Sequence, residues 1–180
     1  PEKSMALLRE AGYGPDHPLE LTWKTSSDPF RLRLATVMQQ QLADVGMRVR
    51  IKSYDFGTFF GDIKAGTFQL YSLTWDGLKT PDTFRYIFHS DSIPPGGANR
   101  GRYRSMQADR LIETAENVAD IDAQVTLYRQ LQQLLLHDLP YVPLWYEDQL
   151  AAYRPDTIDD YVPRRDGSYD ALIRLHRHRE

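Results

Sequence analysis

Two stretches of the sequence carry side chains that can bind a small molecule. Lys24 and Thr25 close an alternating apolar segment and lead into two serines, and a polar loop begins at Trp75. An indole offers a flat surface for stacking, hydroxyls offer hydrogen bonds, and carboxylates and ammonium groups pair with charged ligand groups. The predicted ligand contacts in this loop are Trp75, Asp76, Gly77, Lys79 and Asp82.

Some of these residues also have a purely structural explanation. Trp75 taken alone is as typical of a core position as of a ligand contact, and Gly77 is more typical of a tight turn. The density of polar side chains in this loop nevertheless favours recognition, because binding residues concentrate in loops that a rigid scaffold positions.

The sequence lacks the common catalytic and nucleotide-binding motifs. It contains no Gly-x-Ser-x-Gly, no phosphate loop and no His-Glu-x-x-His. His176 and His178 have a spacing that can chelate a metal from a strand, but a basic, poorly ordered chain end explains them better. His89 stands isolated, which is typical of a surface or capping histidine. Adjacent carboxylates such as Glu147 and Asp148 face opposite sides of a strand, so they form no acid–base pair.

The composition is that of a globular domain or of one lobe of a larger protein. The 180 residues include 22 basic and 25 acidic side chains, for a net charge of −3, and no cysteine. This balance argues against a nucleic-acid partner, which normally requires a basic excess. No apolar run is long enough to cross a membrane. The lack of cysteine excludes a disulfide scaffold and suits an oxidising compartment. The first residue is a proline, so we expect the chain to begin within a longer protein.

The first half of the chain alternates predicted strands and helices. Residues 19–24 and 47–54 alternate apolar and polar side chains, as half-buried strands do. Between them, Asp28 caps a helix near residues 30–45, whose apolar positions recur at three- and four-residue steps. Asp55 caps a second helix that ends at Gly66.

A third strand is predicted at residues 68–74, which gives a strand–helix–strand–helix–strand order. Short connections of this kind indicate a parallel sheet with right-handed crossovers, and therefore an α/β fold. Ligands of such sheets bind beyond the carboxyl ends of the strands. The loops after Lys24 and after residue 74 should therefore lie on one rim.

The second half of the chain no longer alternates strands and helices. Residues 75–104 contain several dipeptides typical of turns and loops. The apolar run at residues 141–146 is predicted to be a buried or edge strand, and Pro143 favours the edge because it cannot donate a hydrogen bond. Further helices are predicted at residues 1–12, 82–88, 105–115 and 122–137.

Six segments together resemble the C-terminal part of the family 5 extracellular solute-binding proteins, the dipeptide-, oligopeptide- and nickel-binding receptors of ABC importers. The resemblance covers nearly the whole chain in the family's order. The segments are Ala6 to Tyr13, Gln40 to Val49, Ala65 to Trp75, Gly97 to Tyr103, Leu127 to Gln132 and Asp138 to Trp145. Asn99 and Arg100, within the fourth segment, join Lys24 and Thr25 as expected ligand contacts.

The resemblance implies one lobe of a two-lobed receptor that closes on a peptide or another small solute. The expected fold is a type II periplasmic-binding-protein lobe, with three layers, a mainly parallel sheet, C-terminal helices and added strands. Residues 1–154 would form most of the C-terminal lobe, and residues 155–180 a tail that crosses to the other lobe. The implied partners are the N-terminal lobe and the permease, in the periplasm or tethered outside the membrane. No chemistry, cofactor, metal or nucleic acid is implied.

The sequence departs from the family at two positions that contact peptide ends. Leu78 stands where peptide-binding members have an aspartate for the ligand's ammonium group, and Thr25 stands where dipeptide-binding members have an arginine for the carboxylate. Lys24 beside it would hold a carboxylate less strictly than an arginine fork. Substituted peptides, opines, sugars and metal complexes therefore stay open as ligands, besides simple peptides.

Three other expectations accompany the receptor interpretation. We expect the isolated chain to fold but to bind ligand weakly or not at all, because half a cleft buries about half a ligand. Its tail is expected to be mobile, to fold back, or to pair with a second copy in a swapped dimer. A small stand-alone α/β enzyme and a sensing or chaperone-like relative of the receptors are the alternative functions.

Overall fold

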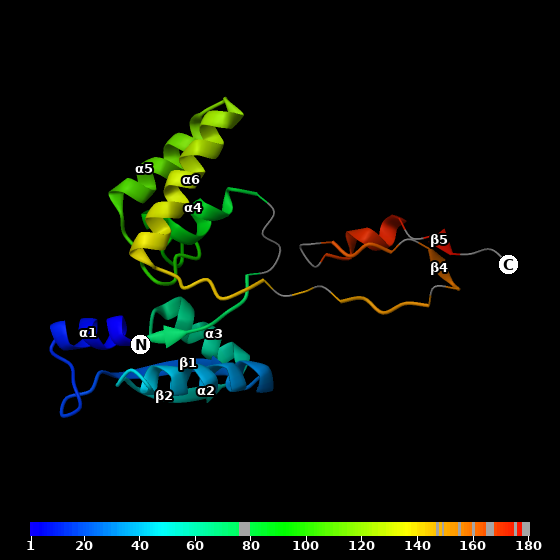
Figure 1. Ribbon diagram of the computed structural model, residues 1–180. Coiled ribbons are helices and arrows are strands. Elements are labelled where there is room, and N and C mark those ends of the chain that lie inside the picture. The colour runs from blue at the N-terminus through cyan, green and yellow to red at the C-terminus, as the bar shows by residue number, and fades with distance from the viewer. Residues whose placement is uncertain are drawn as a thin grey trace. The chain divides into compact units, whose positions relative to one another are not determined.

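The computed structural model divides the chain into two compact units, which are described separately (Figure 1). Unit 1 comprises Pro1–Leu73 and Ile93–Arg102, and unit 2 comprises Thr74–Ser92 and Tyr103–Glu180. The structure describes residues 1–75, 80–146, 148, 150–154, 156–159, 161–164, 168–174 and 176–177.

Unit 1 is built on a parallel sheet of three strands in the order β2-β1-β3. The strands are β1 (Glu20–Ser26), β2 (Arg48–Tyr54) and β3 (Leu70–Tyr71). The central strand β1 pairs with β2 along its whole length, from Glu20 opposite Arg48 to Ser26 opposite Tyr54. Its pairing with β3 is limited to two residues, so the third strand is much shorter than the predicted 68–74. The predicted α/β fold with parallel strands is confirmed.

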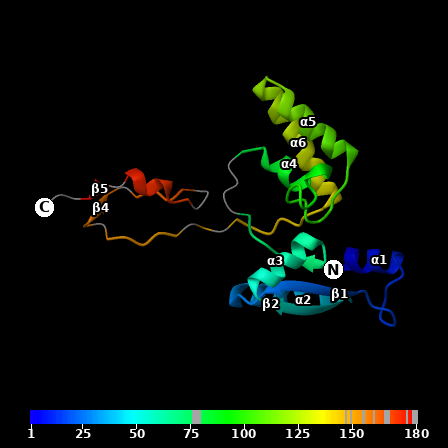
Figure 2. The same ribbon diagram turned by 180° about the vertical axis from the view of Figure 1, so that it is seen from behind.

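Two crossover helices cover opposite faces of this sheet, as the views in Figures 1 and 2 agree. Helix α2 (Pro29–Ala43) packs on the face that carries Trp23 and Val49, where Ala35 is fully buried. Helix α3 (Phe56–Ala65) packs on the other face, toward which Lys24 of β1 points.

The ends of these helices follow the predicted signals. The carboxylates of Asp28 and Asp55 accept hydrogen bonds from the backbone N–H of Arg31 and Thr58, which begins α2 and α3 respectively. Gly66 ends α3 with a left-handed φ of 77°. Helix α1 (Glu2–Glu10) precedes the sheet and contributes no fully buried side chain.

Unit 2 centres on two helices that lie side by side, α5 (Met106–Asn117) and α6 (Ile121–Asp138) (Figure 1). Short helix α4 (Thr83–Phe88) packs against them through Phe84, whose ring stacks on Tyr128 at 5.4 Å. A 3-10 turn, η1 (Ser90–Ser92), follows α4. The fully or nearly buried core is formed by Ala108, Ile112, Ala115, Tyr128, Leu131 and Leu135.

His89 is buried in unit 2, so it is not a surface histidine, but it stands at the C-cap of α4, as the capping alternative predicts. Its Nδ1 accepts a hydrogen bond from the backbone N–H of Asp91, and its Nε2 lies 3.3 Å from a carboxylate oxygen of Glu113. The ring therefore connects the end of α4 to α5. This part of the fold depends on contacts between residues far apart in sequence.

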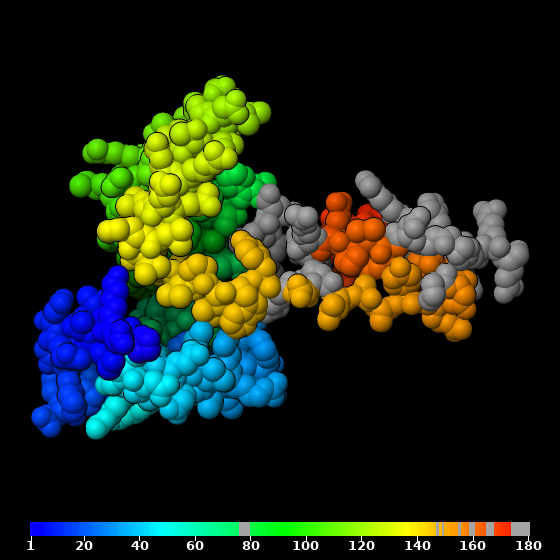
Figure 3. Space-filling model, viewed as in Figure 1, coloured from blue at the N-terminus to red at the C-terminus, as the bar shows by residue number. Residues whose placement is uncertain are grey.

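The predicted strand at residues 141–146 is wrong for this chain. All six residues are described and none of them is in a strand. The segment follows an extended path (Figure 1), and the gold atoms near residue 145 lie at the visible surface in Figure 3. An apolar run becomes a strand only when a neighbouring backbone completes the ladder, and Pro143 removes one donor.

After this segment the chain forms small elements of its own. Strand β4 (Ile158–Asp159) pairs antiparallel with β5 (His176–Arg177), with the 3-10 turn η2 (Tyr169–Arg174) between them. The sequence predicts a basic, poorly ordered end here, but His176 pairs with Asp159 in this sheet. His178 lies outside the described residues. No helix in the described ranges combines the length and apolar character that a membrane crossing needs.

Two glycines, Gly61 within α3 and Gly66 at its C-cap, should respond in opposite ways to substitution by alanine. Gly66→Ala should destabilise unit 1 by about 1–2 kcal/mol, because alanine resists a positive φ and its Cβ would lie 2.5 Å from Nε of Arg102. Gly61→Ala should instead stabilise it by about 0.5–1 kcal/mol, because this helical position has open space. Urea unfolding of both variants checks the signs, and a stabilising Gly66→Ala would contradict the described loop packing.

Two leucines of α6 test the core of unit 2. Leu131 is 0% exposed, whereas Leu136 is 60% exposed. Leu131→Ala should lower the free energy of unfolding by about 2–5 kcal/mol through lost burial and a cavity. Leu136→Ala is the matched control and should change it by less than about 0.5 kcal/mol. Similar losses in the two variants, measured by thermal or urea unfolding, would show that α6 presents a different face to the core.

Candidate ligand-binding site

The carboxyl ends of the three parallel strands bring hydroxyl groups together in unit 1. Thr25 lies opposite Ser53 and Ser26 lies opposite Tyr54 in the β1–β2 register, and Ser72 is the first residue after β3. The backbone N–H of Ser27 donates to the carbonyl of Tyr54 at 2.7 Å, which ties the two strand ends together. This arrangement gives the sheet a polar edge.

Thr25 is almost fully buried on the face of β1 that packs toward α2. Its hydroxyl oxygen has no hydrogen-bond partner within the described structure, and the same is true of Trp23 Nε1 and Ser72 Oγ. Buried polar atoms without a partner are costly, and each calls for a specific explanation. Two of these atoms, the hydroxyls of Thr25 and Ser72, lie at or just beyond the carboxyl ends of β1 and β3, whereas Trp23 lies in the middle of β1.

Lys24 faces the other side of the sheet, where Asp62 of α3 already binds it. Its Nζ lies 2.6 Å from Oδ2 of Asp62, and their side chains are only 16% and 30% exposed. The ammonium group also lies 5.7 Å from the centre of the Tyr54 ring. The hydrogen bond from Lys24, with a second from Thr67, lowers the pKa of the Asp62 carboxyl. The expected ligand cation therefore has an internal partner.

Asn99 and Arg100 lie in a loop of unit 1 that packs on α3. Asn99 is fully buried, and the Arg100 guanidinium lies 5.0 Å from the centre of the Phe60 ring. Arg102, two residues on, donates to the carbonyl of Ala65 at the end of the helix. Lys24 and Arg100 therefore both contact α3, although they lie far apart in sequence.

The remaining predicted contacts belong to unit 2. Trp75 is half-buried, and Asp82 is exposed just before α4, where it accepts a hydrogen bond from the Thr80 hydroxyl at 3.1 Å. Asp76, Gly77 and Lys79 lie outside the described residues. The assignment of all nine residues to a ligand stays a prediction.

Phe56 is a candidate contact that sequence reasoning missed. It is the first residue of α3, directly beyond the end of β2, and it is 59% exposed. Its ring stacks on Phe60 at 5.6 Å with an angle of 9° between the planes. Such an exposed, supported ring can stack on a flat ligand group. The signal in the sequence was an aromatic residue directly after the helix-capping Asp55.

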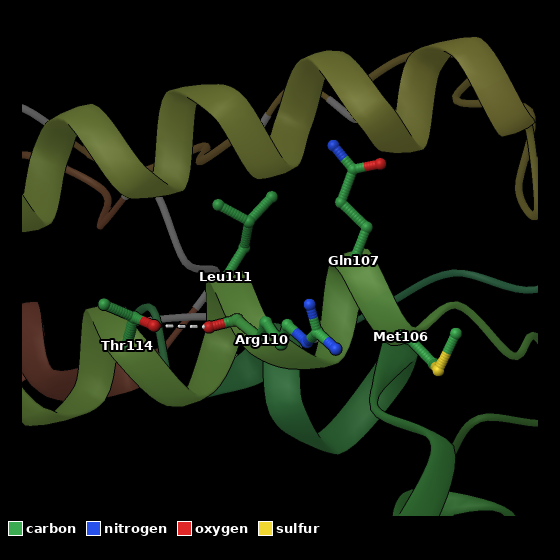
Figure 4. Close-up of a pocket in the computed structure, with 5 residues that line it drawn as sticks. All are labelled: Met106, Gln107, Arg110, Leu111 and Thr114. Atoms are coloured by element: carbon green, nitrogen blue, oxygen red, sulfur yellow. Dashed lines mark hydrogen bonds between the residues drawn. The ribbon is translucent and has the colours of Figure 1, made fainter.

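A hollow in the described surface lies elsewhere, along α5 in unit 2. It measures about 440 Å³ and is lined by Met106, Gln107, Arg110, Leu111 and Thr114. Figure 4 shows Leu111 and Gln107 directed toward the neighbouring helix, and Thr114 donating to the carbonyl of Arg110. One helix supplies all five residues, and the hollow is a shallow surface feature. It lacks the converging polar groups of a specific small-molecule site.

The carboxylate nearest the end of β2 is already engaged. Asp55 is occupied as a helix cap, where hydrogen bonds from the hydroxyl and backbone of Thr58 lower the pKa of its carboxyl. No group of three potential metal ligands occurs among the described residues. The groups that the structure shows around the strand ends are hydroxyls, the exposed Phe56 ring and the Lys24–Asp62 pair.

Comparisons with known proteins agree with this interpretation. Residues 1–94 match the bacterial extracellular solute-binding proteins, family 5. The chain is 33% identical over 147 residues to di/tripeptide-binding protein 2 of Pseudomonas aeruginosa, which covers 80% of this chain and 28% of that protein. It is 30% identical over 142 residues to the dipeptide-binding protein of Escherichia coli, covering 77% of this chain and 26% of the relative.

Solved structures show the same fold. The periplasmic binding protein DppA of Helicobacter pylori, in complex with the peptide STSA, matches with a TM-score of 0.70 and 29% identity over 79% of this chain and 28% of its own. The oligopeptide-binding protein AppA of Bacillus subtilis matches with a TM-score of 0.79 and 23% identity over 99% of this chain and 37% of its own.

The matched regions make up 26% to 37% of the length of these four proteins. The present chain therefore spans between a quarter and two fifths of their length. The matched family consists of solute-binding proteins and not of enzymes. Because the family match covers more than half of the 180 residues, the chain belongs to family 5 of the bacterial extracellular solute-binding proteins.

Proposed function

We propose that this chain is part of the substrate-binding component of an ABC importer, which captures a peptide or a similar small solute and delivers it to a permease. The observation that carries the proposal is the kinship with di/tripeptide- and dipeptide-binding proteins across most of the chain. The polar ends of three parallel strands, with an exposed aromatic ring beside them, support it as well.

The proposed ligand contacts come from both units, without any assumption about how the units are arranged. In unit 1 they are Lys24, Thr25, Asn99 and Arg100, to which the structure adds Phe56. In unit 2 they are Trp75, Asp76, Gly77, Lys79 and Asp82. Aromatic faces would hold the flat parts of the ligand, and the polar groups would fix its orientation.

We assign residues 1–154 to most of a C-terminal lobe and residues 155–180 to a tail that crosses to an N-terminal lobe. Support comes from large apolar side chains in the tail that are exposed in this chain, which would gain a partner surface there. They are Val162, Tyr169, Leu172 and Ile173. Pairing of the tail with a second copy is the alternative way to cover them.

The proposed partners are the N-terminal lobe and the permease subunits, and the proposed location is the periplasm or the outer side of the membrane. A relative of known structure is an ABC transporter-associated periplasmic binding protein. A ligand held between two lobes also predicts that this chain alone binds more weakly than the intact receptor.

A thermal-shift panel of short peptides on the intact receptor tests this function. A true ligand should raise the melting temperature, since a ligand at 100 times its Kd stabilises the folded state by about 2.7 kcal/mol. Phe56→Ala should weaken binding about tenfold through lost stacking, and Trp75→Ala should abolish the shift. Leu7→Ala is the matched control, because Leu7 in α1 is 54% exposed and Phe56 is 59% exposed.

The panel separates the possible outcomes clearly. A shift that survives both aromatic substitutions would remove Phe56 and Trp75 from the binding site. No shift with any peptide would contradict peptide binding and leave the other solutes to be screened. Micromolar binding by the 180-residue chain alone would contradict the requirement for a second lobe.

A further inference from the structure

The charged groups near the carboxyl ends of β1 and β2 are largely engaged within unit 1. Asp28 and Asp55 accept the hydrogen bonds that begin α2 and α3. Lys24 is bound to Asp62, and Arg100 lies over the Phe60 ring. Each of these charged groups therefore has an interaction partner within unit 1 in the absence of ligand.

The Lys24–Asp62 pair is held more firmly than an exposed ion pair. Its 2.6 Å separation is that of a charge-assisted hydrogen bond, and both side chains are mostly covered. Asp62 is fixed on α3, between the buried residues Phe59 and Ile63, so it acts as an intramolecular competitor for the ammonium group. A ligand carboxylate would have to displace it and leave a half-buried carboxylate unpaired, which is costly.

A structural role for this pair is also evident. Lys24 lies directly opposite Lys52 in the β1–β2 register, and like charges at such positions repel. Asp62 offsets this repulsion at Lys24. Lys52 itself is exposed on the outer strand, so it is the residue that could compete for an anionic ligand group.

The buried polar groups without a partner in and beside the central strand are neutral. The hydroxyl of Thr25 and that of Ser72 have no hydrogen-bond partner within the described structure, nor does the indole N–H of Trp23. Neutral donors and acceptors of this kind match amide and hydroxyl groups of a ligand. They do not compensate the full charge of a carboxylate.

Resting on the proposed receptor function, we infer that the ligand group held over the end of β1 is uncharged, an amide or a hydroxyl. We further infer that Asp62 is the specificity-determining residue that keeps a ligand carboxylate from Lys24 on the α3 face of the sheet, because it already binds the Lys24 ammonium group. This lobe thus favours ligands whose bound end is neutral.

The first test needs no physiological ligand. Sodium acetate is titrated into the 180-residue chain while NMR follows the ε-methylene signals of its lysines, with sodium chloride as the ionic-strength control. The ε-methylene signals of Lys24 should shift very little with acetate in the wild type. In Asp62→Asn, Lys24 should bind acetate at least tenfold more tightly. Lys3 on the exposed surface of α1 is the internal control and should respond equally in both proteins.

A wild-type Lys24 that binds acetate as tightly as it does in Asp62→Asn, or as tightly as the exposed Lys3 does, would overturn the inference. The comparison with Lys3 within the wild type decides the question even if the variant does not fold.

The second test uses matched peptides on the intact receptor, each with a free C-terminal carboxylate or a C-terminal amide. The wild type should bind the amide at least as tightly as the acid, and Asp62→Asn should shift the ratio about tenfold toward the acid. A tenfold preference of the wild type for the acid would overturn the inference while leaving the receptor function intact. Loss of that preference in Lys52→Gln would then identify Lys52 as the carboxylate partner.

If no peptide of either form binds, the proposed peptide function fails. The acetate titration still decides whether Lys24 is available to anions, so the two failures are distinguishable.

Discussion

The full-length parallel pairing of β1 with β2 is the interaction on which unit 1 depends. Its register fixes which residues of the central strand face α2 and which face α3. One face carries Trp23 into the apolar layer beneath α2, and the other carries Lys24 to Asp62. A shift of one residue would exchange these faces and place a lysine in the apolar layer, which makes the register strongly specified. The polar edge at the carboxyl ends of the strands is a consequence of this pairing.

Local signals were sufficient to predict most of unit 1 from the sequence. Asp28 and Asp55 are side chains that accept the first backbone N–H groups of a helix, and Gly66 tolerates the left-handed conformation that ends one. Alternating side chains predicted β1 and β2 to within two residues. These features depend on neighbours within a few positions, which is why a single sequence reveals them.

Features that depend on distant contacts could not be predicted in the same way. The partner of Lys24 is 38 residues away, and Asn99 is buried by a loop that returns to unit 1. The run at 141–146 has the composition of a strand but finds no partner strand in the described chain. The sequence therefore predicted where the candidate site lies, at the carboxyl edge of the sheet. The burial and the interaction partner of each side chain could be known only from the structure.

The central claim is that a solute binds at the strand ends of unit 1. Hydrogen exchange of the intact receptor tests this claim most directly. Exchange is measured by mass spectrometry with and without a saturating peptide chosen by its thermal shift. Protection should concentrate at residues 25–27, 54–56 and 72–75. Unchanged exchange at these positions, with protection along the α5 hollow at residues 106–114 instead, would contradict the account.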